Sequence, residues 1–596
     1  MKHLNKKNGV IRNNLFILKI IFSTTPVYAI SFILFGVISG FIQFINSVYF
    51  IRTITNQVQA KESLNKIVTT LIIFALMNVA YLILSNVCNF LMTPLAKIKL
   101  EKHVQVTLLH KAVSIGVSAF DDPNFYDAYI LSMTSMDKKI YAVLETLSNL
   151  LKSIVTTVLT INLIFIIDPF CFILVIASMV ISVFGGKKLN ALLFKRKNEM
   201  LVYDRKMDYT DRLFYLSDYA KEIRMNDISG MLIDDYKKAV DDIRGIISKY
   251  STPIVIFSHL EDMSTLFFDV LYVTSLVLRL VLKGLISVGD FVSMINSAWT
   301  LSNNVREIAR LVNEFNDYSI YIDKFRTFSS ITDENSGDKL LTENTGMLSF
   351  NNVWFHYPNE TKDVLQGITL AIKPHEKIAL VGYNGSGKST LIKLLLRLYD
   401  PQRGVVEANG LNVTEYSLQS YRAEFGVVSQ DFNMYEVSLA ENVAMGELTR
   451  SQYGLVRDTI STVRLFPETE QEDLLSRRIG KEFDENGYIL SGGERQKVAL
   501  ARVIYSSRDC IVLDEPSAAL DPESEYYFNK LISEQLSDKT IIIISHRLST
   551  TRMMDKVFMM ESGQIIESGT HKELMNLNGK YAEMYRVQAQ RYGVLE

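Results

Sequence analysis

The sequence predicts an all-α domain of six transmembrane helices followed by an α/β domain. Before about residue 312, apolar runs recur that are long enough to cross a bilayer, which takes about 20 apolar residues in a helix. After about residue 347, strand-like runs such as KIALVG alternate with helical stretches, as a mostly parallel sheet requires. A polar stretch rich in Thr, Asn, Ser and Gly separates the two patterns. We therefore expect a transmembrane domain at residues 1–328, a linker at 329–346 and an α/β domain at 347–596.

Composition agrees with a membrane half and a soluble half. The 596 residues are too many for one compact core, and 48% are hydrophobic while 21% are charged. A net charge of −2 gives no reason to expect nucleic-acid binding. The three cysteines, Cys88, Cys171 and Cys510, form no CxxC pair and stand at no metal-ligand spacing from a histidine. We expect three buried thiols.

The membrane topology follows from charge. Five Lys or Arg residues precede the first span, so the positive-inside rule places the amino terminus in the cytoplasm. An even number of spans then returns the chain there, which makes this a multi-pass protein of the cell membrane with a cytoplasmic α/β domain. The charged connections at about 97–141 and 187–249 are expected to be helical extensions of the spans. The expected spans are Val27–Phe50, Ile67–Met92, Val143–Ile166, Pro169–Phe184, Ile254–Leu282 and Val288–Val312.

A glycine-rich string, GYNGSGKST, follows a predicted buried strand and opens a predicted helix. Glycines in such a turn let the backbone approach phosphate oxygens, and the helix amino terminus favours negative charge. Lys388 is expected to reach the β- and γ-phosphates and Ser389 to hold Mg²⁺. The candidate phosphate-binding residues are Gly382, Asn384, Gly385, Ser386, Gly387, Lys388, Ser389 and Thr390.

Two carboxylates follow another predicted strand, Cys510–Leu513. Asp514 ends that strand and is placed to orient the magnesium shell. Glu515 beside it is expected to polarise the attacking water, a role that needs a carboxylate within hydrogen-bond reach.

With LSGGERQ (Leu490–Gln496) and CIVLDEPSAALD (Cys510–Asp521), the chain resembles the ATP-binding cassette (ABC) proteins over its whole length, as six spans followed by a cassette. The resemblance implies ATP and Mg²⁺ as ligands and assigns further roles by position. Tyr357 matches the aromatic residue that stacks on adenine, with His356 as an alternative; Gln430 matches the glutamine that contacts magnesium and water; Ser491, Gly492 and Gly493 match the signature; Asp521 matches the loop that faces the neighbouring site; and His546 matches the switch histidine that holds the γ-phosphate. Glu494 stands where relatives more often have glutamine, which does not put hydrolysis in doubt.

In this family the signature closes over the γ-phosphate bound by the opposite subunit, so the resemblance implies a dimer. Because the chain carries both an intact glycine-rich loop with Glu515 and an intact signature, two copies would complete two sites. A homodimer is the simpler expectation, and a heterodimer with a similar chain stays open.

Spans before a cassette on one chain resemble the exporter arrangement. Three segments further resemble exporters of lantibiotics and related ribosomal peptides: FDDPNFYDAY at Phe120–Tyr129, KEIRMNDIS at Lys221–Ser229 and SQDFNMYEVSLAENV at Ser429–Val443. In the family the first two lie near the coupling helices that dock on the cassettes. The expected function is ATP-driven export of a modified peptide by alternating access. The alternatives are a lipid or drug exporter, and a membrane-bound ATPase that senses or sequesters a compound, as in self-immunity.

One face of the fifth span is polar. Asp262, Thr265, Asp269 and Tyr272 follow helical spacing, so they are expected to project to one side. Ionisable residues within a span normally face the protein interior or a water-filled cavity. This polar stripe is our candidate for the substrate path, with a preference for a cationic or amphipathic substrate. The alternative is that it lies outside the hydrocarbon or pairs with a basic neighbour such as Arg306.

Overall fold

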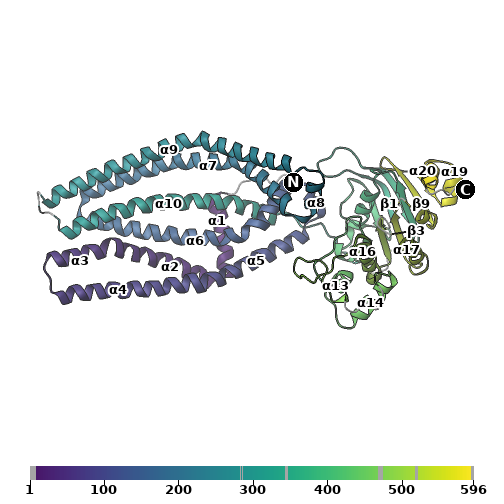
Figure 1. The fold of residues 1–596 in the computed structure, drawn as a ribbon, viewed down its shortest axis with the longest axis horizontal. Coiled ribbons are helices and arrows are strands. Elements are labelled where there is room, and N and C mark those ends of the chain that lie inside the picture. The colour runs from purple at the N-terminus through teal and green to yellow at the C-terminus, as the bar shows by residue number, and fades with distance from the viewer. Residues whose placement is uncertain are drawn as a thin grey trace. The chain divides into compact units, whose positions relative to one another are not determined.

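The computed structural model of the chain describes residues 9–281, 284, 286–341, 346–466, 474–516, 521–545 and 547–591. Its contacts divide the chain into two compact units. The first, here the membrane unit, is Met1–Ala112 with Asp127–Ser330, and the second, here the ATPase-fold unit, is Val113–Tyr126 with Ile331–Glu596. The membrane unit is helical, and both sheets belong to the other unit (Figure 1).

The described part of the membrane unit is built on six long helical stretches, and the described part of each predicted span falls in a different one; Leu282, the predicted end of the fifth span, lies outside the described residues. A shorter helix that the sequence did not predict, α1 (Val10–Thr24), precedes them and packs on the last. The long stretches are α2, η1 and α3 (Pro26–Phe44, Ile45–Tyr49, Phe50–Gln59); α4, η2 and α5 (Leu64–Asn86, Val87–Met92, Thr93–Ser114); α6 (Pro123–Ile167); α7 (Pro169–Tyr215); α9 (Ser229–Val281); and α10 (Val288–Ser329), with α8 (Ser217–Met225) between α7 and α9.

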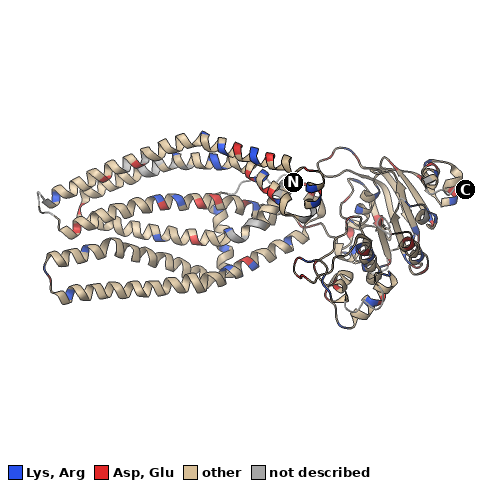
Figure 2. Cartoon of the chain, in the orientation of Figure 1, with Lys and Arg blue, Asp and Glu red and all other residues tan. Residues whose placement is uncertain are grey.

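Length and composition distinguish the helices that can cross a membrane by those criteria alone. Among the described residues, three stretches qualify, Pro26–Gln59, Leu64–Ser114 and Lys139–Ile167, and Pro169–Val180 is a shorter apolar segment. Figure 2 shows α2 and α4 almost free of charged side chains along most of their length, whereas charges gather toward one end of α7 and α9. These charged ends are the predicted helical extensions.

Helix α1 is fixed to α10 by a buried asparagine. The Asn13 amide donates to the carbonyl oxygen of Ser319 at 3.1 Å, and Arg326 donates to its side-chain oxygen at 2.8 Å. Asn13 is fully buried, so these hydrogen bonds satisfy polar atoms that water cannot reach.

The ATPase-fold unit contains a six-stranded sheet in the order β10-β9-β3-β8-β7-β6 and a four-stranded antiparallel sheet in the order β2-β1-β4-β5. In the larger sheet all neighbours are parallel except β9 and β10. The strands are β1 (Leu348–Phe355), β2 (Leu365–Ile372), β3 (Lys377–Gly382), β4 (Arg403–Ala408), β5 (Leu411–Asn412), β6 (Phe425–Val428), β7 (Cys510–Asp514), β8 (Thr540–Ile544), β9 (Lys556–Glu561) and β10 (Gln564–Gly569). The helices are η3 (Val117–Asp121), α11 (Lys388–Leu395), η4 (Val413–Glu415), α12 (Leu418–Arg422), α13 (Leu439–Ala444), α14 (Gln452–Thr462), α16 (Gly492–Ser506), α17 (Pro522–Glu534), α18 (Leu548–Arg552), α19 (His571–Leu577) and α20 (Lys580–Arg591).

Burial on both faces explains why the central strands read as continuous apolar runs. Successive residues of β8 alternate between two cores: Ile542 packs with β1, β2 and α11, and Ile543 with α16 and α17. A strand covered on both sides needs no polar face. The three cysteines are free and buried, as predicted.

Candidate functional site

The candidate site lies where parallel strands of the larger sheet end side by side. In the register of the sheet, Leu380 of β3 and Asp514 of β7 both pair with Ile544 of β8. The chain leaves β3 into the glycine-rich loop, β7 into Glu515, and β6 toward Gln430. Ligands of open α/β sheets bind at the carboxyl ends of the strands, so this edge is where the predicted residues belong.

The glycine-rich loop needs glycine at three positions. Gly382, Gly385 and Gly387 have φ angles of 150°, 80° and 101°, which side-chain-bearing residues rarely adopt. A Cβ on Gly382 would lie 2.2 Å from the backbone oxygen of Met560, whereas a Cβ on Gly385 would meet nothing within 4 Å. Gly385 therefore borders an open cradle that a side chain would fill.

Lys388 begins α11 with its side chain folded back into the loop. Its Nζ donates to the carbonyl oxygens of Gly382 at 2.8 Å and Tyr383 at 3.1 Å. Burial lowers the pKa of Lys388, and the charges of Glu515 and Asp514 oppose that shift. A buried ammonium at a helix amino terminus makes this loop attractive to an anion.

Two buried polar atoms, one in the loop and one beside it, lack a hydrogen-bond partner among the described residues: Oγ of Ser386 and Oδ1 of Asp514. Burial raises the pKa of Asp514, a hydrogen bond from Ser389 opposes that rise, and the charge of Glu515 adds to it. Unsatisfied buried oxygens are costly unless something else binds them. The cradle, the ammonium and a free carboxylate oxygen next to Ser389 fit a nucleotide phosphate with a divalent cation.

Glu515 adopts a left-handed backbone conformation, with φ 52°. Its N–H donates to Ile544 at 3.0 Å, and Gln496 Nε2 donates to its carbonyl oxygen at 3.3 Å and also contacts the carbonyl of Pro516. Gln496 is buried on α16, so it connects the LSGGERQ helix to the backbone that carries Glu515. Gln496 belongs to the LSGGERQ motif, but the sequence indicated no role for it; only the fold brings it to β7.

Tyr357 lies half-buried just after β1. Its hydroxyl is 3.0 Å from the hydroxyl of Thr390 on α11, and its ring is T-shaped against Phe355 and Tyr399. His356 is also half-buried, and its Nδ1 lies 3.2 Å from the carbonyl oxygen of Tyr357. Tyr357 therefore forms a hydrogen bond with the helix that follows the glycine-rich loop, whereas the Nδ1 contact of His356 is with its own neighbour in the chain.

The remaining cassette residues begin helices or follow strands. Ser491 caps α16 and forms a capping box with Glu494: Ser491 N–H donates to Glu494 at 2.7 Å. Glu494 thus has a local structural role that glutamine can also fill. Asp521 caps α17 and accepts from Ser524 N–H at 2.7 Å, a bond that lowers the pKa of Asp521. Among the loop and signature residues, Asn384, Gln430, Ser491 and Gly492 are exposed and Gly493 is half-buried, whereas His546 lies outside the described residues.

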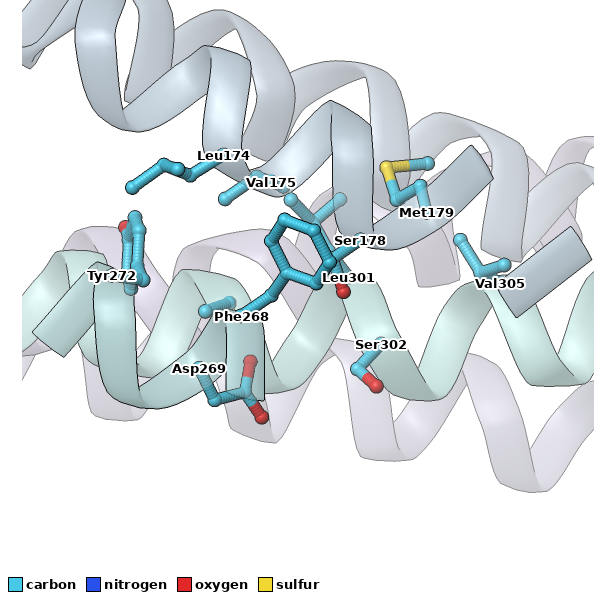
Figure 3. Close-up of a pocket in the computed structure, with 11 residues that line it drawn as sticks. Leu174, Val175, Ser178, Met179, Phe268, Asp269, Tyr272, Leu301, Ser302 and Val305 are labelled. Atoms are coloured by element: carbon cyan, nitrogen blue, oxygen red, sulfur yellow. The ribbon is translucent and has the colours of Figure 1, made fainter. Parts of the chain in front are cut away.

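The polar stripe of α9 divides into different environments. Asp262 is exposed and pairs with Arg306 of α10 at 3.2 Å. Tyr272 is buried and donates to the carbonyl oxygen of Met294 at 3.0 Å. Asp269 lines a small pocket between α7, α9 and α10, shown in Figure 3, while the side chain of Thr265 lies outside the described ones.

Most of the residues that line that pocket are apolar. Figure 3 shows the Phe268 ring between the Leu174 side of the pocket and Asp269. Its volume, about 20 Å³ for the centres of water molecules, exceeds the ~10–15 Å³ that one water needs. In this conformation it accommodates water but no substrate of the size of a peptide or a lipid.

Comparison with known proteins agrees with this fold. The family model "ABC transporter" matches residues 365–518. A bacterial Atm1-family ABC exporter solved with ATP bound superposes with a TM-score of 0.77 at 20% identity, covering 95% of this chain and 98% of the other.

Two relatives illustrate the range of proteins that this chain resembles. The subtilin transport ATP-binding protein SpaT of Bacillus subtilis is 25% identical over 580 residues, 95% of this chain and 92% of SpaT. The ATP-dependent lipid A-core flippase of Methylobacillus flagellatus is 35% identical over 306 residues, 51% of this chain, and the match spans about half (52%) of the flippase.

Fold, glycine-rich loop and comparisons define an ABC ATPase domain that follows a multi-pass membrane domain. Residues 365–518 match the ABC transporter family model, and the whole chain has the fold of an ABC exporter with its membrane and ATPase domains fused.

Proposed function

We propose that this chain hydrolyses ATP to drive export of a peptide across the cell membrane, as a dimer that works by alternating access. The observation that carries the ATPase part is the phosphate cradle, formed by the open space at Gly385, the Lys388 ammonium and the unpartnered oxygen of Asp514. A triphosphate and Mg²⁺ would satisfy these groups together.

Each residue then has a defined task. Lys388 would leave the loop carbonyls for the β- and γ-phosphate oxygens, because phosphate offers a stronger charge-assisted hydrogen bond. Ser389, Asp514 and Gln430 would hold the magnesium shell, with Mg²⁺ neutralising phosphate charge. Glu515 would orient and deprotonate the attacking water, and Gln496 donates to its carbonyl oxygen and so helps to hold the backbone that carries it. His546 is assigned to the γ-phosphate by family resemblance alone.

The signature implies a second subunit. Ser491, Gly492 and Gly493 open α16, whose free N–H groups suit an anion. The exposure of Ser491 and Gly492 supports a role toward a phosphate bound by the partner, and Asp521 would face the same interface. We propose a homodimer, with the amino terminus and the ATPase domain in the cytoplasm. The binding energy of ATP can drive the change only if ATP binds the closed form more tightly than the open form.

Coverage favours a peptide as the substrate. An alignment over 95% of the chain necessarily includes most of the membrane domain, and the protein it matches is named for subtilin transport. The flippase match extends over 51% of the chain, so it need not include the helices that hold substrate. Because that flippase is more identical within the matched part, at 35% against 25%, a lipid is the second candidate.

The membrane helices offer one candidate contact for a cationic peptide. Asp269 lines the pocket between α7, α9 and α10, whereas Asp262 is already paired with Arg306. An ionisable residue in a span that faces a cavity is a functional candidate. We therefore narrow the proposed substrate path from the polar stripe to Asp269.

The test is ATP-dependent uptake into inside-out vesicles that contain the full chain, offered cationic peptides, lipids and hydrophobic dyes separately. We expect peptide accumulation that disappears in Glu515→Gln and persists in Glu534→Gln, a matched control. Glu534 lies at the surface of α17, 3.8 Å from Lys530. Lipid accumulation without peptide would replace the proposed substrate. Hydrolysis without accumulation of any of them would contradict export of these classes and favour the sensing alternative.

A further inference from the structure

Helix α20, the last helix of the described chain, packs beside α18, the helix that follows strand β8. The last residue of β8, Ile544, pairs with Leu380 of β3 and Asp514 of β7, at the edge of the sheet that holds the candidate site. Beyond it, Ser545 is 2% exposed and its hydroxyl accepts from Arg547 N–H at 3.0 Å. Whatever fixes α18 therefore also fixes the chain where it leaves β8 beside the phosphate cradle.

Side chains hold α18 on two sides. Toward α17, Arg547, which directly precedes α18, forms an ion pair with Glu525. Toward α20, Thr551 is 4% exposed and forms a hydrogen bond with the hydroxyl of Tyr581. Because α18 has only five residues, far fewer than the about 12–15 that an isolated helix needs, its contacts decide where it lies.

Tyr581 connects α18 with α19 through one hydroxyl group. Its side chain is fully buried, and the hydroxyl oxygen lies 2.8 Å from Nδ1 of His571, the first residue of α19. Burial raises the pKa of Tyr581 and the hydrogen bond with Thr551 opposes that rise, which identifies Thr551 as the donor to the phenol oxygen. The phenol hydrogen is then left for His571. We call Thr551, Tyr581 and His571 the hydroxyl–imidazole chain.

The far end of the hydroxyl–imidazole chain is anchored to the sheet. The N–H groups of Lys580 and Tyr581 donate to Glu567 of β10 at 2.6 and 3.1 Å, which fixes the start of α20. The imidazole of His571 packs on two phenol rings, with its centroid 4.8 Å from that of Tyr585 and 5.8 Å from that of Tyr581. An anchored phenol can position α18 only while its hydrogen bonds persist.

The acceptor at the end of this chain is a neutral imidazole. Burial lowers the pKa of His571, and the positive charge of Arg552 on α18 lowers it further. The other titratable groups of the elements packed around it are Tyr581, Tyr585, Glu567 and Glu573. Nδ1 of a neutral imidazole can accept from the Tyr581 hydroxyl, whereas both nitrogens of a protonated imidazole donate. Protonation would therefore remove the acceptor.

We propose that Tyr581 and His571 are positioning residues for ATP hydrolysis, which hold α18 in the place that the ATP site requires and lose that hold when the imidazole is protonated. This rests on the proposed function, in which His546, outside the described residues and between β8 and α18, holds the γ-phosphate. Because the folded pKa of His571 lies below the unfolded value of ~6.5, the contact is fully present above that pH and is lost as pH falls through the folded pKa.

The test measures kcat and KM for ATP of the full chain in lipid nanodiscs, from about pH 7.5 down to about pH 5.5. Tyr581→Phe keeps the ring and removes the hydroxyl. At the higher pH it should lower kcat about two- to tenfold, as for loss of a neutral hydrogen bond. KM should change less than about twofold, because the glycine-rich loop is carried by β3 and α11 and not by α18.

The pH profile separates positioning from a merely structural role. His571→Asn places an amide oxygen where Nδ1 accepts, and this acceptor cannot be protonated. The variant should match the unaltered chain near pH 7.5 and exceed its kcat about threefold or more near pH 5.5. In a chain that already carries Tyr581→Phe, the same substitution should change nothing at either pH.

Two matched variants control for stability and for titration elsewhere in the unit. Tyr421→Phe removes the hydroxyl of another buried phenol, which donates to Leu395 at 2.6 Å. His375→Asn removes an exposed imidazole. Neither should change kcat or its dependence on pH.

Three results would overturn the positioning role. They are an unchanged kcat in Tyr581→Phe, an equal fall in Tyr421→Phe, and a pH profile of His571→Asn that follows that of the unaltered chain. If the unaltered chain bound no fluorescent ATP analogue and hydrolysed no ATP, the proposed function itself would be wrong, and the positioning role with it.

Discussion

Replacement of one loop glycine by alanine should separate nucleotide binding from folding. A Cβ at Gly385 meets nothing within 4 Å, although its φ of 80° is unfavourable for alanine. Gly410, in the turn between β4 and β5, has nearly the same φ, 76°, and the same open space. Gly410→Ala should therefore cost the same backbone strain energy as Gly385→Ala, but at a position away from the proposed phosphate cradle.

The expected magnitudes follow from these geometries. A left-handed conformation costs alanine about 1–2 kcal/mol, which for a domain of this size lowers Tm by roughly 2–4 °C per kcal/mol. Gly385→Ala and Gly410→Ala should share that shift. Only Gly385→Ala also places a methyl group where the backbone would approach phosphate, which should cost one hydrogen bond to a charged group. Loss of such a bond, about 1.5–3 kcal/mol, weakens ATP binding roughly ten- to hundredfold.

The assay pairs thermal unfolding of the full chain in nanodiscs with titration of a fluorescent ATP analogue. Gly382→Ala marks the other extreme, because its Cβ would lie 2.2 Å from the backbone oxygen of Met560, and should lower Tm far more than either variant. Unaltered analogue affinity in Gly385→Ala, or an equal loss in Gly410→Ala, would refute the assignment of the cradle.

Three further predictions concern carboxylates. Burial raises the pKa of Asp514, so the ionised carboxylate destabilises the nucleotide-free protein. The contribution of Asp514 to stability is present below the unfolded pKa of ~3.9 and is lost as pH rises through the higher folded pKa. Asp514→Asn should therefore raise the Tm of the nucleotide-free chain at pH 7, and this increase should shrink toward pH 4. The same variant should abolish MgATP hydrolysis. A lower Tm than that of the unaltered chain at pH 7 would contradict the stability prediction. Asp168 caps α7 and forms an ion pair with the partly exposed Arg279 at 2.7 Å. Asp168→Ala should be about 1 kcal/mol less stable in thermal unfolding than Asp168→Asn, because asparagine can still cap the helix. Equal Tm values of the two variants would show that the cap contributes little. Asp269→Asn should lower stimulation of ATPase activity by a cationic peptide severalfold, whereas Asp262→Asn, whose carboxylate is already paired with Arg306, should not; the reverse order would move the substrate contact to the exposed pair.

The sequence predicted well where chemistry is local in the chain. In the glycine-rich loop, the need for positive φ and for close backbone approach restricts the residue type at each position, so the order of residues from Gly382 to Ser389 already indicates the fold of the turn. The spans were placed for a similar reason, because a bilayer demands a long apolar helix whatever its neighbours are.

Residues that act through partners distant in sequence were harder to interpret. The stripe on α9 has one helical face, but Arg306 pairs with Asp262 while Asp269 borders a pocket, and only packing against α7 and α10 distinguishes them. Gln496 was visible within its motif, yet its contact with the backbone of Glu515 depends on how α16 packs beside β7.

The sequence by itself determined the class of this protein: apolar runs of spanning length, strands buried on both faces, and a phosphate-binding loop between strand and helix are all set by neighbours in the chain. Only the tertiary structure decided that the hydroxyl of Tyr399 meets Asp121 of η3. They are 278 residues apart, and the hydrogen bond between them exists because the α5–α6 connection packs within the ATPase-fold unit. No periodicity or motif encodes such a pair, since its formation depends on the packing of the whole unit and not on local backbone preference.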